Sequence, residues 1–149
     1  MDLTGLLREM TEGWHAQALE QHKAFAAKLP DSPLVMMGDV DRLQQVFTNL
    51  VGNAFKYTPT GGATTLALTR EDGMAVIGVT DEGEGIAPDQ LPHVFELFQR
   101  ATTTGTGLGI GLAVVRALVE AHGGHVTAAS GGIGQGATFT VRLPLSAER

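Results

Sequence analysis

The polar residues best suited to chemistry are four side chains on one predicted helix, residues 41–57. Asn49 and Asn53 are four residues apart, and Lys56 and Tyr57 follow one turn later. At 100° per residue, the two amides lie on one side of the helix, along the border of its apolar stripe. Such a pair alone is typical of edge residues that bond to a neighbouring loop. An amide oxygen is also a suitable hard ligand for Mg²⁺, which takes few protein ligands.

A second group of candidates follows a predicted apolar strand. The segment Asp81-Glu82-Gly83-Glu84-Gly85-Ile86 places a carboxylate at the strand end, followed by two glycines. The Asp81 carboxylate could accept a hydrogen bond from an exocyclic amine such as that of adenine, and the glycines would admit a flat ring. An Asp–Gly turn alone is weak evidence, since such turns join elements in many proteins.

The third candidate is a glycine-rich run before a helix. Glycine recurs at 105, 107, 109 and 111, and the chain then enters a predicted helix. Backbone N–H groups at a helix N-terminus can hold phosphate. The run is neither a dinucleotide fingerprint, because Leu112 stands where the third glycine belongs, nor a P-loop, because no Lys-Ser/Thr pair follows. Close helix packing would explain one or two of these glycines.

Composition excludes several functional classes. The chain has 149 residues with 20 Gly and no Cys, and 10 Lys+Arg against 16 Asp+Glu give a net charge of −6. Absence of cysteine excludes disulfides, thiolate zinc sites and a cysteine nucleophile. The acidic balance argues against nucleic-acid binding through a basic face. No apolar run approaches the roughly 20 residues of a membrane span.

The remaining reactive side chains form no recognisable centre. Ser32, Ser130 and Ser146 fall at turns or termini and do not assemble a nucleophilic triad. The histidines lack metal-site spacing and are interpreted as ordinary surface or helix residues; they are His15, His22, His93, His122 and His125.

The elements that must position these groups form one domain of mixed α/β class. The expected packing is one mixed sheet covered by helices on one face. Helices are predicted at 4–28, 41–57, 92–98 and 108–121, and 101–107 is predicted as a flexible loop. Strands are predicted at 33–37, 64–70, 74–80, 125–130 and 137–143.

Taken in order, these segments resemble the ATP-binding catalytic domain of sensor histidine kinases, in the GHKL superfamily. DVDRLQQVFTNLVGNAFKYT at 39–58 resembles the N-box, DEGEGI at 81–86 the first glycine box, and VFELFQR at 94–100 the F-box. GLGIGLAVVRALVEAHGGHV at 107–126 resembles the second glycine box, and GQGATFTVRLP at 134–144 the closing strand. The resemblance implies a two-layer α/β sandwich with a mixed, mostly antiparallel sheet, spanning nearly the whole chain.

The resemblance also implies roles, residue by residue. Asn53 would be the Mg²⁺ ligand, Asn49 would lie near the triphosphate, Lys56 would reach phosphate, and these three would form the catalytic set. Asp81 would accept from the adenine amine, supported by Thr138. The base and phosphates of ATP would also contact Tyr57, Gly83, Gly85, Ile86, Phe98, Thr106, Gly107, Leu108, Gly109, Gly111 and Leu112.

Other features of the resemblance concern the reaction. ATP-hydrolysing relatives carry a general-base Glu at the position of Asn49, and an amide cannot take a proton from water at neutral pH. This favours phosphoryl transfer to a protein histidine over hydrolysis. The segment between Arg100 and Gly107 is short for the family's ATP lid and has no basic residue. Neither His15 nor His22 has the phosphoacceptor motif.

We therefore expect a single catalytic domain over 1–149, without the dimerisation and phosphoacceptor domain. Its cofactors would be ATP and Mg²⁺, and its partners a histidine-containing dimerisation domain and, downstream, a response regulator. We expect no contact of this domain with nucleic acid or membrane, and we expect a cytoplasmic location. The alternatives are a GHKL kinase acting on Ser/Thr, as anti-sigma kinases do, and a nucleotide-binding signalling domain without catalysis.

Overall fold

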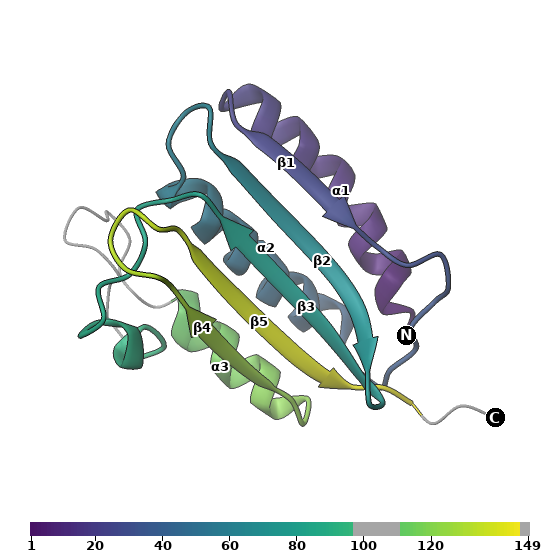
Figure 1. Cartoon of the computed structure of the whole chain (residues 1–149). Coiled ribbons are helices and arrows are strands. Elements are labelled where there is room, and N and C mark those ends of the chain that lie inside the picture. Colours follow the sequence, from purple (N-terminus) through teal and green to yellow (C-terminus); the bar gives the residue numbers. More distant parts are fainter. Residues whose placement is uncertain (97–110, 147–149) are drawn as a thin grey trace.

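The structure is a computed structural model that describes residues 1–96 and 111–146. Helices and strands alternate irregularly along the chain (Figure 1). In order they are α1 (Leu3–Glu20), β1 (Ala24–Lys28), α2 (Val40–Tyr57), β2 (Ala63–Glu71), β3 (Met74–Asp81), the 3₁₀ helix η1 (Leu91–His93), α3 (Gly111–Ala121), β4 (His125–Ala129) and β5 (Ala137–Pro144).

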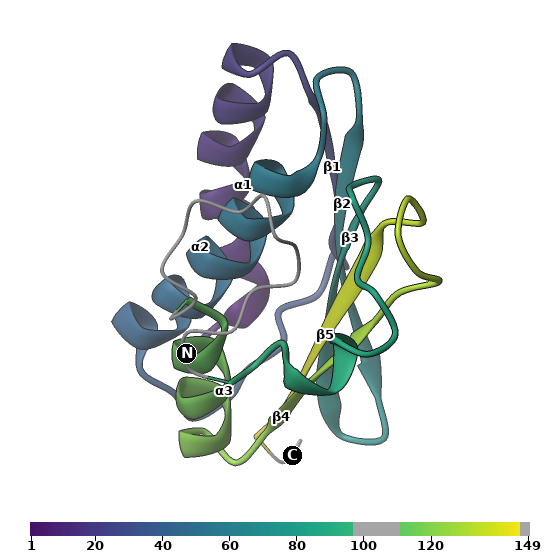
Figure 2. The same cartoon turned by 90° about the vertical axis from the view of Figure 1, so that its left-hand side faces the viewer.

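The strands form one five-stranded sheet in the order β1-β2-β3-β5-β4. β1 pairs with β2 in parallel, and the other three neighbouring pairs are antiparallel. The three α-helices of the described residues, α1, α2 and α3, lie on the same side of this sheet, as the rotated view shows (Figure 2). The predicted two-layer α/β sandwich with a mixed, mostly antiparallel sheet is therefore confirmed.

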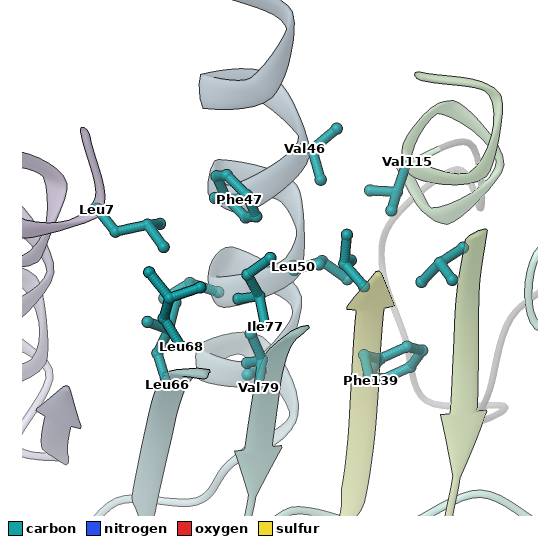
Figure 3. Packing of buried hydrophobic residues seen from close by; sticks show 14 of the residues in the cluster. Leu7, Val46, Phe47, Leu50, Leu66, Leu68, Ile77, Val79, Val115 and Phe139 are labelled. Atoms are coloured by element: carbon teal, nitrogen blue, oxygen red, sulfur yellow. The ribbon is translucent and has the colours of Figure 1, made fainter. Parts of the chain in front are cut away.

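The core fills the space between the two layers. Alternate residues of β3 and β5 are buried, as expected of strands with one covered face. The apolar stripe of α2 supplies the largest share from the helices, and its Val46, Phe47 and Leu50 are fully buried. Figure 3 shows these side chains against those of the sheet and of α1 and α3, namely Leu7, Leu66, Leu68, Ile77, Val79, Val115 and Phe139.

The N-terminal region differs from the sequence prediction at two places. The first helix ends at Glu20 rather than near Lys28, and residues 24–28 form the edge strand β1. His22 makes the turn between α1 and β1, with a φ of 57° in the left-handed region. Because the residue in this conformation is a histidine, no glycine or proline marks the turn in the sequence. The strand predicted at 33–37 is wrong: a single bridge joins Val35 to Asp2.

The other predicted elements agree apart from their ends. The helix predicted at 92–98 is reduced to η1 within the described residues. The helix predicted at 108–121 is described from Gly111 onward, and the loop predicted at 101–107 lies outside the described residues. No helix in the described part of the chain has the length and apolar character needed to cross a membrane.

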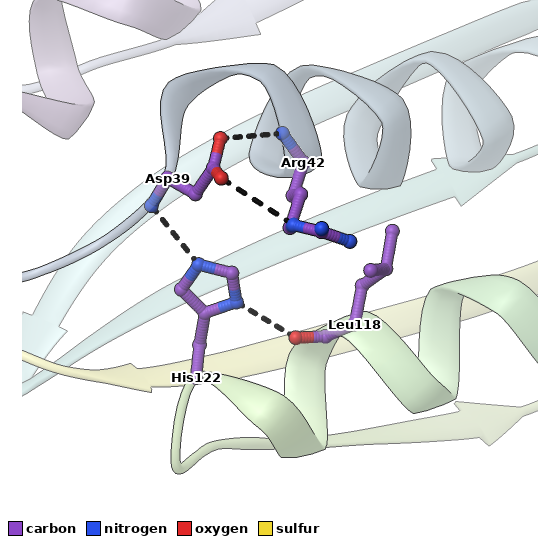
Figure 4. Close-up of polar contacts among 4 residues, drawn as sticks. All are labelled: Asp39, Arg42, Leu118 and His122. Atoms are coloured by element: carbon purple, nitrogen blue, oxygen red, sulfur yellow. Dashed lines mark hydrogen bonds and ion pairs between the residues drawn. The ribbon is translucent and has the colours of Figure 1, made fainter.

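A histidine joins the start of α2 to the end of α3. The Asp39 carboxylate caps α2 by accepting from the backbone N–H of Arg42 at 3.2 Å. His122 Nε2 accepts from the backbone N–H of Asp39 at 3.1 Å, and its Nδ1 donates to the Leu118 carbonyl at 2.7 Å (Figure 4). These bonds require a neutral imidazole, because a proton on Nε2 would remove the acceptor. They hold together the two helices that flank the candidate site.

Candidate nucleotide-binding site

A pocket lies between the C-terminal part of α2 and the end of the sheet where β3 stops. Asn53 and Tyr57 line it from α2, and Asp81, Gly85 and Ile86 line it from β3 and the following loop. Ala137 and Phe139 of β5 complete the lining. The space between protein atoms here is about 260 Å³, a figure that includes open solvent as well as the pocket. Two of the three separated candidate segments therefore meet at one place.

Asp81 is the buried acid of this pocket. It is the last residue of β3 and points to the helix-covered side, where only 7% of its surface is exposed. Its Oδ1 accepts from the backbone N–H of Gly83 at 2.8 Å. Burial raises the pKa of Asp81, because the charged form loses solvation, and backbone N–H groups of Gly83 and Ala137 partly oppose this rise. Each carboxylate oxygen has two lone pairs, so beside these two backbone contacts Asp81 can still accept from a ligand with a hydrogen-bond donor.

The two glycines after Asp81 are required by close contacts within the protein. A Cβ on Gly83 would lie 2.6 Å from the Tyr57 carbonyl oxygen. A Cβ on Gly85, whose φ is +75°, would lie 2.0 Å from the Gly132 carbonyl oxygen. These glycines are thus required by the packing of the turn against the end of α2 and the loop after β4, and room for a flat ring stays a prediction. Gly85 nevertheless lines the pocket.

The polar side chains of α2 lie in three different settings. Asn53 lines the pocket, whereas Asn49, one turn earlier, donates from Nδ2 to the carbonyl of Gly111 at 3.4 Å. This long contact brings Asn49 to the start of α3, the helix that follows the glycine-rich run. Lys56 is exposed, and its Nζ lies 5.4 Å from the centre of the Tyr57 ring. Lys56 therefore lies next to Tyr57, which is a residue of the pocket wall.

Only part of the glycine-rich run is described. Gly111 opens α3, and Leu112 is partly buried against the core. A Cβ on Gly111 would meet no described neighbour within 4 Å, so packing there does not require glycine. The other residues predicted to contact ATP in this region lie outside the described residues: Phe98, Thr106, Gly107, Leu108 and Gly109.

Thr138 does not lie where the resemblance implied. Its hydroxyl is 3.1 Å from that of Thr80, on the uncovered face of the sheet, whereas Asp81 points to the covered face. Side chains alternate between faces along a strand, so a shift of one residue changes the face. Ala137, which pairs with Asp81, occupies the covered face and donates its backbone N–H to the carboxylate. Thr138 therefore does not support Asp81.

Two residues near Asp81 were not found by sequence reasoning. Ser130 was interpreted as a turn residue, but its Oγ accepts from the backbone N–H of Ile86 at 3.0 Å. Thr64 pairs with Asp81 across β2 and β3, and in the described chain its buried hydroxyl has no hydrogen-bond partner. Thr64 could have been found from the sequence, because it is a polar residue at a position of β2 that faces the helices. Nothing in the sequence indicated Ser130, because its contact joins residues 44 positions apart.

Comparison with known proteins identifies the family. Residues 38–147 match the family described as histidine kinase-, DNA gyrase B-, and HSP90-like ATPase. The chain belongs to this family. This membership supports the ATP-binding domain that the resemblance of its motifs to the GHKL superfamily implied. The resemblance to histidine kinase catalytic domains is confirmed.

The relatives are sensor histidine kinases. The chain is 36% identical over 148 residues to sensor histidine kinase RppB of Synechocystis, covering 96% of this chain and 32% of RppB. It is 40% identical over 153 residues to sensor histidine kinase TrcS of Mycobacterium tuberculosis, covering 97% and 29%. The chain thus spans about a third of the length of these relatives.

Solved structures agree with the sequence comparison. The mycobacterial sensor histidine kinase MprB superimposes with a TM-score of 0.83 at 27% identity, and the match covers 99% of both chains. Full-length ShkA, solved in complex with AMPPNP, superimposes with a TM-score of 0.82 at 35% identity, covering 99% of this chain and 31% of ShkA.

Proposed function

We propose that this domain binds Mg-ATP in the pocket around Asp81 and donates the γ-phosphoryl group to a histidine on a separate dimerisation domain. A response regulator would then receive the phosphoryl group. The observation that carries the proposal is the buried Asp81 carboxylate facing a pocket that also contains Asn53. The choice of a histidine as acceptor is supported by the names of RppB and TrcS, which are both sensor histidine kinases.

The base would be adenine. With its contacts to the Gly83 and Ala137 N–H groups kept, the Asp81 carboxylate can still accept from the 6-amino group of the ring, because each carboxylate oxygen has two lone pairs. Guanine carries a carbonyl at that position, so a buried acceptor would face another acceptor. Such unpaired polar groups cost about 1–3 kcal/mol. ADP should therefore bind roughly 5- to 150-fold more tightly than GDP.

The chemistry of the donors fits Mg²⁺. Asn53 offers an amide oxygen in the pocket, and Mg²⁺ favours oxygen ligands while keeping several waters and phosphate oxygens. In the described residues no group of three or more His, Asp or Glu side chains could form a metal cage. When bound with ATP, Mg²⁺ supplies charge neutralisation for the phosphates. Asn53 would hold the ion, and Lys56, on the same helix, would reach phosphate.

In the transfer, the main contribution of this chain would be to position the phosphates of ATP for the acceptor histidine. A ring nitrogen of the acceptor histidine forms a bond to the γ-phosphorus with its lone pair, and the bond from phosphorus to the β,γ-bridging oxygen breaks, releasing ADP. Asn49 cannot serve as a base for water, because an amide has no titratable group at neutral pH. Its amide instead contacts the start of α3. This arrangement favours transfer over hydrolysis.

The test uses the chain alone and then with an acceptor. Calorimetry should show that ADP binds more tightly than GDP, and equal affinities would contradict the adenine assignment. With γ-labelled ATP the isolated chain should neither label itself nor hydrolyse ATP quickly. Adding a cognate dimerisation domain that carries a histidine should produce an acid-labile phosphoprotein. Acid-stable labelling of Ser or Thr would instead support the anti-sigma type of kinase, and rapid hydrolysis without a partner an ATPase.

A further inference from the structure

The loop between β4 and β5, residues 130–136, packs directly on the loop that follows Asp81. Both loops lie at the same end of the sheet (Figure 1). The Gly134 N–H donates to the Glu84 carbonyl at 2.7 Å, and the Ser130 hydroxyl accepts from the Ile86 N–H at 3.0 Å. Two hydrogen bonds therefore cross between the loops, on either side of Gly85.

The Ser130 hydroxyl is fully used in this contact. It accepts from the backbone N–H groups of Ile86 and Gly132, at 3.0 and 3.2 Å, and it donates to the Gly136 carbonyl at 2.6 Å. A hydroxyl has one proton to donate and two lone pairs that accept. One side chain thus fixes its own loop and the pocket loop at the same time.

The contact leaves no room for adjustment around Gly85. The Gly132 carbonyl oxygen would lie 2.0 Å from a Cβ on Gly85, and the Asp81 carbonyl oxygen would lie 2.2 Å from a Cβ on Gly136. The backbones of the two loops are therefore in direct contact. Because Gly85 and Ile86 line the pocket, a shift of the β4–β5 loop would move the pocket wall.

We propose that Ser130 is a positioning residue for purine binding: its hydroxyl holds Ile86 and Gly85 in the conformation that the base requires. Ser130 itself does not line the pocket around Asn53, so it acts through the loop and not by touching the base there. The inference rests on the proposed function, since it assigns to Ser130 a part in nucleotide affinity. It extends the site to a loop that none of the glycine-box motifs includes.

The experiment compares Ser130→Ala with two controls by calorimetry with ADP, at a temperature where all variants are folded. Ser130→Ala should bind ADP about tenfold more weakly, because the Ile86 N–H loses its acceptor and the loop is no longer fixed. Ser130→Thr keeps the hydroxyl and should restore affinity to within about threefold of the unmodified chain. Ser32→Ala removes an exposed hydroxyl from another loop and should leave affinity unchanged.

Hydrogen exchange supplies a readout that a general loss of stability would not reproduce. The Ile86 amide should exchange faster in Ser130→Ala while amides of the central strand β3 keep their protection. ADP affinity within twofold of the unmodified chain in Ser130→Ala would overturn the inference and leave the proposed function intact. Failure of the unmodified chain to bind ADP would overturn the proposed function itself.

A measurement on the unmodified chain covers the case in which Ser130→Ala does not fold. Added ADP should slow exchange of the Ile86 and Gly134 amides together, because both bonds cross between the same two loops. Slowing at Ile86 without slowing at Gly134 would contradict coupled positioning of the loops.

Discussion

Replacing Asp81 by Asn should change nucleotide binding and stability in opposite directions. In the folded chain Asp81 is 7% exposed, and its Oδ1 already accepts from the Gly83 N–H at 2.8 Å. An Asn side chain has one oxygen and one NH₂ group. If the oxygen stays with Gly83, the NH₂ group faces the amine of adenine, so two donors oppose each other.

The loss of affinity can be estimated from this geometry. A hydrogen bond to a charged acceptor contributes about 1.5–3 kcal/mol, which corresponds to roughly 10- to 150-fold in affinity. ADP should therefore bind Asp81→Asn weaker by that factor in calorimetry. The preference for ADP over GDP should fall at the same time, because the group that distinguishes them has been changed.

Stability should respond in the other direction. Burial raises the pKa of Asp81 above its unfolded value, so the charged form destabilises the fold at neutral pH. Without nucleotide, Asp81→Asn should be as stable as the unmodified chain at pH 7 or more stable, by up to about 1 kcal/mol. As pH falls through the folded pKa, the unmodified chain takes up a proton at Asp81 and should gain stability relative to the variant, until the unfolded pKa is passed.

Urea unfolding of both proteins at several pH values measures this difference, and other carboxylates cancel in the comparison. The reasoning is refuted by an Asn variant that binds ADP as tightly as the unmodified chain. It is refuted equally by a folded variant that is less stable by several kcal/mol at pH 7, since the carboxylate would then be a stabilising group.

Three further substitutions test other parts of the site and fold. Asn53→Ala should weaken Mg-ATP binding while circular dichroism stays unchanged; unchanged affinity in calorimetry would remove Asn53 as the metal ligand. Thr64→Val should be neutral or stabilising in thermal unfolding, because the buried Thr64 hydroxyl lacks a partner in the described chain, and clear destabilisation would reveal a partner. His122→Ala should lower the free energy of unfolding by about 1 kcal/mol through loss of its bond to Asp39. The exposed His125→Ala is its control, and equal effects of the two would contradict a joining role.

The sequence predicted the elements that a regular apolar stripe or a turn marks. The stripe from Leu43 to Ala54 predicted α2, and the turns beside them predicted β3 and β5, so the two main walls of the pocket were predicted together with Asn53 and Asp81. The edge strand β1 was missed, because no glycine or proline separates it from α1. A local sequence pattern defines α2, β3 and β5, whereas β1 is defined by its pairing with β2.

The rest of the site depends on contacts between distant segments. The resemblance placed Thr138 beside Asp81, but strand register decides the face, and the register puts Ala137 opposite Asp81. Ser130 was passed over because a lone serine at a turn has no distinguishing pattern. Its contact with Ile86 arises only when β4 and β5 bring the two loops together.

The strand order has a consequence for behaviour at high concentration. The strands inside the sheet, β2, β3 and β5, have nine, eight and eight residues, whereas the edge strands β1 and β4 have five each. Unpaired N–H and C=O groups on a sheet edge are templates for intermolecular strand pairing, and short edges offer few of them. With the longest strands inside, Asp81 lies at the end of the central strand, and the described sheet has little exposed edge on which aggregation could begin.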